Sequence, residues 1–171
     1  MLFLLLLIVS SCDINENYRI VKQWSGKTVV VSDRMKTLVS KDSLNLSILT
    51  NHRPKILVCS DSLHCGPCQL KLQSWDSIVC KYNSSIDFIF TIHPRNRAEI
   101  LAYSKTINFN YPIFLDEYDD MGIVNNLPDD INYRCFLLNE DNQVLLIGNP
   151  MYNKRLMKLY IQALDSLSNC K

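Results

Sequence analysis

An apolar run that leads directly into a pair of cysteines is the most informative part of this sequence. The run is KILVCS, at residues 55–60, and the pair is Cys65 and Cys68, which enclose Gly66 and Pro67. An uninterrupted apolar stretch of this length predicts a strand buried on both faces of a parallel sheet. The cysteine pair is therefore expected just beyond the end of a central strand.

A helix is predicted to begin at the cysteine pair. Leu72, Trp75 and Val79 follow Cys68 at steps of four, three and four residues, which places all four side chains on one face of a helix. Trp75 is interpreted as a core residue of this helix. A strand followed by a helix is the first half of a β-α-β unit.

The rest of the chain continues this alternation. IDFIFTI at 86–92 predicts a second buried strand, and YPIFLD at 111–116 predicts a short extended piece before a brief helix near Met121. Residues 133–148 predict two antiparallel strands, and an apolar stripe after Asn153 predicts a C-terminal helix. The predicted fold class is α/β, with a mixed central sheet flanked by helices.

The segment before this domain is predicted to be a short N-terminal β extension, residues 18–41. Two β-rich runs surround Ser25 and Gly26, which is typical of a hairpin. NLSIL, at 45–49, is a weaker candidate for a further strand. Residues 42–171 are then the main domain, and the acidic run LDEYDD at 115–120 is interpreted as a solvated turn because it lacks the glycine and distal glutamate of a calcium loop.

The first residues predict export from the cytoplasm. An apolar run from Leu2 to Val9 is far shorter than the ~20 residues of a membrane-spanning helix, and small residues follow it, as in a signal peptide. Val9-Ser10-Ser11-Cys12 resembles the lipobox of bacterial lipoproteins, although the usual basic residues before the apolar run are missing. The resemblance implies that residues 1–11 are removed, that Cys12 is lipidated, and that residues 12–17 tether the domain to the membrane. A plain secretory signal is the alternative.

A cysteine at a strand-to-helix turn has a defined chemistry. Unpaired backbone N–H groups and the positive end of the helix dipole stabilise a thiolate, so the pKa of Cys65 is expected to fall below its usual ~8.5. Cys68 lies one helical turn further on, where it can resolve a mixed disulfide. Pro67 costs no hydrogen bond in a first helical turn, and Gly66 allows a partner backbone to approach the sulfur.

HCGPC at residues 64–68, placed in this order of strands and helices, resembles the thioredoxin superfamily. The signal segment and the YPIFLDE insertion resemble its extracytoplasmic, membrane-tethered TlpA-type and redoxin-like branch. The resemblance covers roughly residues 40–168. It implies a membrane-anchored thiol–disulfide oxidoreductase in the bacterial cell envelope, with Cys65 as the attacking and Cys68 as the resolving thiol.

Three positions depart from the family pattern. His64 replaces the usual aromatic residue before the first cysteine, where an imidazolium would favour the thiolate and a plain surface histidine is the alternative. Cys59 stands where many thioredoxins carry a buried acid. Tyr133 aligns with the family's cis-proline, and Pro128 lies five residues too early, so a trans bond is expected there because a non-proline cis bond costs ~2.5–4 kcal/mol. Substrate docking beside Tyr133 is expected to differ accordingly.

The implied partners are protein thiols and disulfides, the membrane through the anchor at Cys12, and an unidentified membrane electron donor. The Gly-Pro pair resembles that of reducing thioredoxins, which favours reduction of partner disulfides. The redox-active disulfide Cys65–Cys68 is the only redox group expected, with no metal and no other cofactor, since no second paired motif accompanies the cysteines. A net charge of +1 gives no reason to expect nucleic acid.

Two other functions are compatible with the same residues. Ser62 and Cys65 match part of the peroxidatic motif of peroxiredoxins, but Val58 replaces the expected proline. Alternatively, the pair is a static disulfide in a non-catalytic envelope lipoprotein. The remaining cysteines are interpreted as buried apolar residues or structural bridges whose pairing the sequence leaves open: Cys59, Cys80, Cys135 and Cys170.

Overall fold

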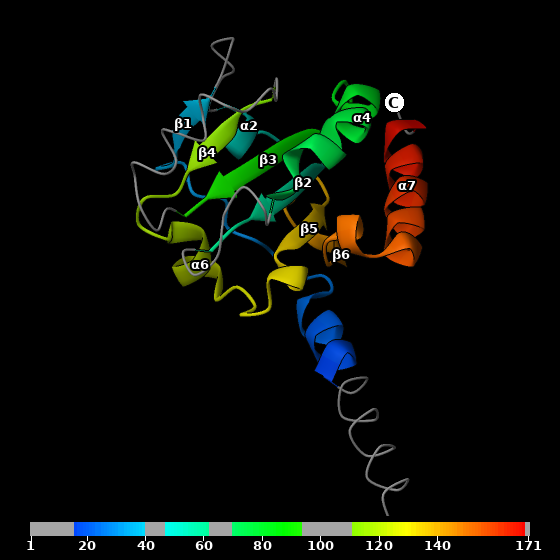
Figure 1. The fold of residues 1–171 in the computed structure, drawn as a ribbon, viewed down its shortest axis with the longest axis horizontal. Coiled ribbons are helices and arrows are strands. Elements are labelled where there is room, and N and C mark those ends of the chain that lie inside the picture. Colours follow the sequence, from blue (N-terminus) through cyan, green and yellow to red (C-terminus); the bar gives the residue numbers. More distant parts are fainter. Residues whose placement is uncertain (1–15, 40–46, 62–69, 94–110, 170–171) are drawn as a thin grey trace, which may run out of the picture.

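The computed structural model describes residues 16–39, 47–61, 70–93 and 111–169. Six strands form one mixed sheet in the order β1-β4-β3-β2-β5-β6 (Figure 1). The strands are β1 (Lys36–Val39), β2 (Lys55–Cys59), β3 (Asp87–Ile92), β4 (Ile113–Leu115), β5 (Cys135–Leu138) and β6 (Val144–Ile147).

The centre of the sheet is parallel and its margins are antiparallel. β2 pairs in parallel with β3, and β3 pairs in parallel with β4. β1 runs antiparallel to β4, while β5 and β6 form an antiparallel pair beside β2. All residues of β2 and β3 are buried, as predicted for strands covered on both faces. The predicted α/β class and mixed sheet are confirmed.

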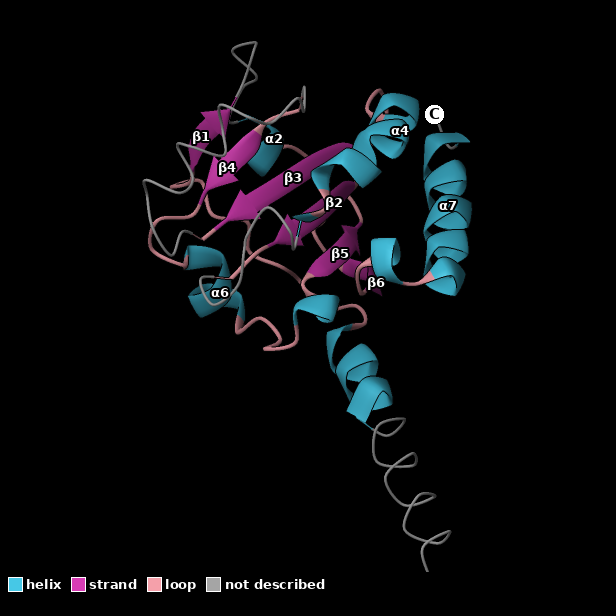
Figure 2. Ribbon diagram, in the orientation of Figure 1, coloured by secondary structure: helices cyan, strands magenta, loops and turns pink. Residues whose placement is uncertain are grey.

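The helices divide between the two faces of the sheet (Figure 2). α4 (Leu72–Tyr82) and α7 (Lys154–Asn169) pack on one face, where Trp75, Tyr160 and Leu164 are buried. The apolar stripes predicted for these two helices are confirmed. Residues 16–24, which are helical, lie on the other face with α2 (Ser47–Thr50) and α6 (Asp120–Asn125).

The hairpin predicted around Ser25 and Gly26 is wrong. Residues 16–24 are helical, and Ile20 and Trp24, one turn apart, pack against the sheet. Gly26 has φ 73 and follows the helix end, where the Ser25 amide still donates to the Val21 carbonyl. A glycine with a left-handed backbone can end a helix as readily as it can form a hairpin turn. The Ser25-Gly26 pair therefore did not distinguish a hairpin from a helix end.

The N-terminal segment contributes β structure only in part. Thr28 forms an isolated bridge with Gln143 of the β5–β6 turn, and residues 36–39 form β1. The strand considered at 45–49 is also wrong, because residues 47–50 form α2. Ile48 and Leu49 fill the core from this short helix. No helix among the described residues is both long and apolar enough to cross a membrane.

Candidate functional site

The carboxyl ends of β2, β3 and β4 meet at one edge of the sheet. Ser60 and Asp61 follow β2, His93 follows β3, and Asp116 follows β4. Ser60, Asp61 and Asp116 are buried, although all three are polar. Polar groups gathered at the carboxyl ends of parallel strands are typical of a functional site in an α/β fold.

The predicted catalytic residues continue from this edge but lie outside the described residues. Cys65 and Cys68, together with His64, Gly66 and Pro67, belong to residues 62–69, which connect β2 to α4. Cys12 lies outside the described residues as well. The structure therefore describes the two ends of the cysteine segment and what those ends contact.

Backbone hydrogen bonds fix the near end of the segment. The Cys59 amide donates to the Arg134 carbonyl at 2.9 Å, and the Ser60 amide donates to the Thr91 carbonyl at 3.0 Å. The end of β2 is thus held by β3 on one side and by the residue before β5 on the other, up to Ser60. A rigid strand end restricts where the following residues can lie.

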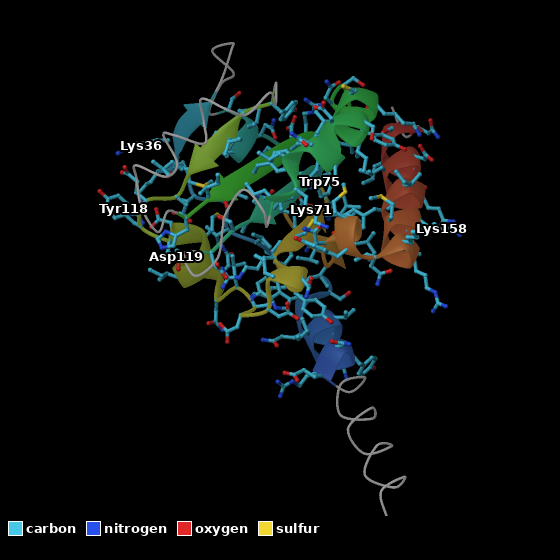
Figure 3. The ribbon with its side chains drawn as sticks, viewed as in Figure 1. Lys36, Lys71, Trp75, Tyr118, Asp119 and Lys158 are labelled. Carbon is cyan, nitrogen blue, oxygen red and sulfur yellow. The ribbon has the colours of Figure 1, made fainter. Side chains whose placement is uncertain are left out.

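Core packing fixes the far end. Leu70 and Leu72 are buried, and Lys71 between them has a left-handed backbone with φ 46. Trp75, labelled in Figure 3, lies below α4. It packs edge-on against Phe88 and Phe90 at centroid distances of 6.5 and 5.9 Å. The prediction that Trp75 is a core residue is confirmed. α4 begins at Leu72, after the left-handed Lys71, and Leu70 before it is also helical; the predicted helix start at the cysteine pair lies outside the described residues.

Tyr133 lies in the loop that faces the end of β2. It ends the short helix η1 (Ile131–Tyr133), and no peptide bond among the described residues is cis, so the trans bond predicted before Tyr133 is confirmed. Its hydroxyl hydrogen-bonds Asn17 in the N-terminal helical segment. Arg134 Nε donates to the Pro128 carbonyl at 2.6 Å, which closes the loop on itself.

Comparisons with known proteins bear on the fold. No protein-family model matches the sequence, and no curated protein matches it either. A candidate thiol:disulfide interchange protein DsbE from Chlorobium tepidum is similar in structure, with a TM-score of 0.58 and 16% identity over 82% of this chain and 99% of the other. A candidate protein disulfide isomerase from Bacteroides thetaiotaomicron has a TM-score of 0.58 and 17% identity, over 85% and 90% of the two chains.

A third solved structure has a similar fold. A variant of PrxQ from Xylella fastidiosa has a TM-score of 0.51 and 11% identity, over 81% of this chain and 96% of the other. The chain has a thioredoxin-like fold. The resemblance drawn from HCGPC and the order of elements is thereby confirmed at the level of the fold.

Within this thioredoxin-like fold, Cys59 and Cys135 are both free and buried, on opposite faces of the sheet. Burial raises the pKa of Cys59 to about 12, although a hydrogen bond with Thr91 opposes the shift. Burial also raises the pKa of Cys135. The interpretation of both residues as buried apolar positions is confirmed. Cys80 on α4 is free and exposed, and Cys170 lies outside the described residues.

Asp116 was missed by the sequence analysis, which treated residues 115–120 as a solvated turn. That interpretation is wrong for Asp116 and Asp120, which are 2% and 6% exposed. The Asp116 carboxylate accepts the amides of Asp120 and Met121 at 2.8 and 2.9 Å, and burial raises its pKa. Its position directly after a buried strand was the signal that it faces the carboxyl edge of the sheet.

Metal ligands do not gather in the described part of the chain. Across residues 16–39, 47–61, 70–93 and 111–169, no three histidine, cysteine or acidic side chains come together as a metal site. His93 Nδ1 hydrogen-bonds the Asp116 carbonyl at 2.8 Å. The ionisable groups buried at this edge of the sheet are thus carboxyl groups and the Cys59 thiol.

Proposed function

We propose that this protein is a thiol–disulfide oxidoreductase that exchanges electrons with protein disulfides through Cys65 and Cys68. The observation that carries the proposal is the position of HCGPC in the β2–α4 connection of a thioredoxin-like fold. That connection leaves the sheet at the carboxyl end of its parallel strands, where α/β folds bind their ligands.

The proposed reaction is a two-step exchange. The Cys65 thiolate attacks one sulfur of a partner disulfide, the partner S–S bond breaks, and the other partner sulfur leaves as a thiolate that takes up a proton. The Cys68 thiolate then attacks Cys65, forming the Cys65–Cys68 disulfide and releasing the second partner thiol. Two electrons pass from the pair to the partner, so a membrane dithiol donor must reduce the pair again.

The neighbouring residues tune this exchange. His64 as an imidazolium favours the Cys65 thiolate, Pro67 stiffens the segment, and Gly66 leaves room for the partner backbone. Tyr133 takes part in docking from the facing loop. Cys59 stands at the position of the family's buried acid, so no carboxylate there accepts the proton of Cys68. Burial raises the pKa of the Cys59 thiol itself to about 12.

Activity of thiol variants tests the proposal. The full-length chain should catalyse reduction of insulin by a dithiol, and Cys65→Ser and Cys68→Ser should each abolish catalysis. Cys80→Ser is the matched control, because Cys80 is also a free thiol but lies exposed on α4, outside the pair. Equal activity of all three variants would refute the proposal.

The direction of electron flow has its own measurement. A midpoint potential near −270 mV for the Cys65–Cys68 couple would fit a reductase, and one near ~−120 mV would instead indicate an oxidant. The potential can be read by alkylation and mass spectrometry across a graded redox buffer.

Membrane attachment through Cys12 belongs to the same proposal. The protein would be lipid-anchored and would face the periplasm or the cell exterior. Expression in a bacterium with labelled palmitate should label the full-length chain, and Cys12→Ser should lose both the label and the membrane association. Retention of the label in Cys12→Ser would exclude lipidation at this residue.

A thiol peroxidase is the second candidate, favoured by the structural similarity to PrxQ. Ser62 and Cys65 would then hold and reduce the peroxide. Peroxide consumption that survives Cys68→Ser would favour this function, whereas disulfide reduction needs both thiols. A Cys65–Cys68 bridge that resists a mild dithiol would instead indicate a non-catalytic protein.

A further inference from the structure

A groove with a volume of about 420 Å³ lies beside the end of β6. Its walls come from four parts of the chain: the helical segment 16–24, η1, the turn after β6 with η2 (Pro150–Tyr152), and the first turns of α7. The residues that carry the argument are Val21, Tyr133, Asn149, Tyr152, Arg155 and Leu159. We call this the Arg155 groove.

The Arg155 groove lies next to both ends of the cysteine segment. Lys71, which immediately precedes α4, places its Nζ 3.8 Å from the centroid of the Tyr152 ring. Figure 3 shows Lys71 between α4 and the η2 region. On the other side, Tyr133 adjoins Arg134, whose carbonyl accepts the Cys59 amide. A ligand in the groove would therefore lie near Lys71, which follows the cysteine segment in sequence, and near Arg134, which contacts the end of β2 before it in space.

The walls of the groove expose apolar surface. Val21, Tyr152 and Leu159 are 45%, 45% and 50% exposed, although each is a large apolar or aromatic side chain. Three such residues around one concavity are typical of a binding surface rather than of scattered surface positions. The groove therefore favours a ligand with apolar side chains.

Two polar side chains of the groove, Asn149 and Arg155, have donor groups that bond to no described residue. Asn149 is 4% exposed, and its Oδ1 accepts the Met151 amide at 3.0 Å, but its amide nitrogen donates to no group in the described part of the chain. This nitrogen is not one of the fully buried atoms that lack a partner, so it is open to a ligand. The Arg155 guanidinium forms no ion pair with any described residue. Arg155 is exposed, so both groups are accessible to a ligand, and a carboxylate is the acceptor that suits a guanidinium best.

The rest of the groove fixes where the anion would lie. Asn153 Oδ1 already accepts the backbone amides of Arg155 and Leu156. These amides at the start of α7 are therefore not free to bind an anion. At the opposite end, the pKa of Tyr133 is raised by burial and then by the charges of Asp130 and Glu16. Acidic groups lie at the Tyr133 end, so an anionic ligand is accommodated at the Arg155 end.

We infer that the Arg155 groove binds an extended, apolar and acidic segment of the partner protein whose disulfide is exchanged. This inference rests on the proposed function and names the substrate class that it selects. A carboxylate of the segment pairs with Arg155, a backbone carbonyl accepts the Asn149 amide, and apolar side chains cover Val21, Tyr152 and Leu159. Partners with basic residues at the same place are disfavoured.

Binding of cysteine-free peptides tests the inference without any redox step. The probe is a fluorescein-labelled peptide of alternating leucine and glutamate residues, compared with one of alternating leucine and lysine, both titrated with the full-length chain by fluorescence anisotropy. We expect the acidic peptide to bind at least about tenfold more tightly, and added salt to reduce the difference.

Three variants make the test specific. Arg155→Glu should weaken binding of the acidic peptide by about tenfold or more, whereas Lys158→Glu, the same charge reversal on the outer side of α7, should change it less than about twofold (Figure 3). Asn149→Asp keeps the acceptor for Met151 but loses the donor, so it should weaken binding too. Circular dichroism of each variant shows whether the fold is retained.

The outcomes separate this inference from the proposed function. Equal affinity for both peptides, no binding of either peptide, or equal effects of Arg155→Glu and Lys158→Glu would overturn the acidic-segment inference. If the acidic peptide binds selectively but Cys65 and Cys68 show no redox activity, the groove still binds acidic segments, and only the proposed oxidoreductase function is refuted. Binding that depends on the peptide's terminal carboxylate alone, tested with an amidated peptide, would also overturn recognition of a chain segment.

Discussion

The carbonyl of Arg134 accepts the amide of Cys59 at 2.9 Å, which joins the Tyr133 loop to the last residue of β2. The chain continues from that residue to Cys65 within six positions. The loop is closed by a second bond, from Arg134 Nε to the Pro128 carbonyl. The end of β2, which precedes the cysteine segment, and the loop that would face a substrate are thus parts of one hydrogen-bonded unit.

The free cysteines should differ in reactivity with iodoacetamide. Cys80 is exposed and should be alkylated in the native protein, whereas Cys59 and Cys135 are buried with raised pKa values and should react only after unfolding. Mass spectrometry of the peptides after timed alkylation measures this order. Rapid labelling of Cys59 at neutral pH would contradict the burial of β2.

Asp116 should make stability depend on pH. Its folded pKa is raised above the ordinary 3.8 by burial, so the folded state holds the proton more tightly than the unfolded state does. The contribution of Asp116 to the free energy of unfolding is therefore fully present at low pH and falls as pH rises from about 3.8 through the folded pKa.

The variant Asp116→Asn isolates this effect. An asparagine has only one side-chain oxygen, so the variant should lose one of the two amide hydrogen bonds. The free energy of unfolding should fall by about 1–3 kcal/mol, and its dependence on the ionisation of residue 116 should disappear. Urea unfolding of both proteins between about pH 4 and pH 7 should show the advantage of wild type shrinking as pH rises. A stability advantage of the wild type that grows with pH would show that the pKa of Asp116 is lowered rather than raised in the folded state.

A buried charge cluster lies at the start of β2, opposite the end that leads to the cysteine segment. Lys55 is fully buried, its Nζ donates to the Asn51 and Arg53 carbonyls, and desolvation lowers its pKa while Asp87 opposes the shift. Asp87 also pairs with Arg53 at 2.9 Å. Asp87→Asn should lower the free energy of unfolding by about 3 kcal/mol, because it leaves the buried Lys55 ammonium and the half-buried Arg53 guanidinium without their carboxylate.

Glu117→Gln is the control for this cluster. It disrupts the Lys36–Glu117 pair at 2.7 Å, whose lysine is 65% exposed, and should cost less than about 1 kcal/mol. Denaturant unfolding at neutral pH compares the two variants. If both variants lose a similar free energy of unfolding, burial does not determine how much the Asp87 interactions contribute to stability.

Two glycines with positive φ give a matched pair of alanine variants. Gly26 has φ 73 with open space around it, so Gly26→Ala should cost about 1 kcal/mol of backbone strain alone. Gly148 has φ 110, and a Cβ there would lie 2.9 Å from Leu156 Cδ2, in the wall of the Arg155 groove. Gly148→Ala should lose more stability and should also weaken peptide binding. Identical behaviour of both variants would contradict this account of the groove wall.

The sequence alone determined the central part of the fold. The apolar runs of β2 and β3 and the helical stripe of α7 are strong periodic signals, because buried elements must present apolar side chains to the core. The position of HCGPC between a buried strand and a helix followed from the same pattern. These features depend on local spacing, which a sequence displays directly.

Only the tertiary structure decided what surrounds those elements. Residues 16–24 became a helix because Trp24 can fill the core above Phe136, with ring centroids 5.0 Å apart, and no local signal contains that contact. The position of Asp116 after a buried strand was visible in the sequence, but its burial and its two amide partners at the start of α6 appear only in the structure. The Arg155 groove likewise needs four segments that are distant in the chain, since a concave surface is a property of packing rather than of spacing.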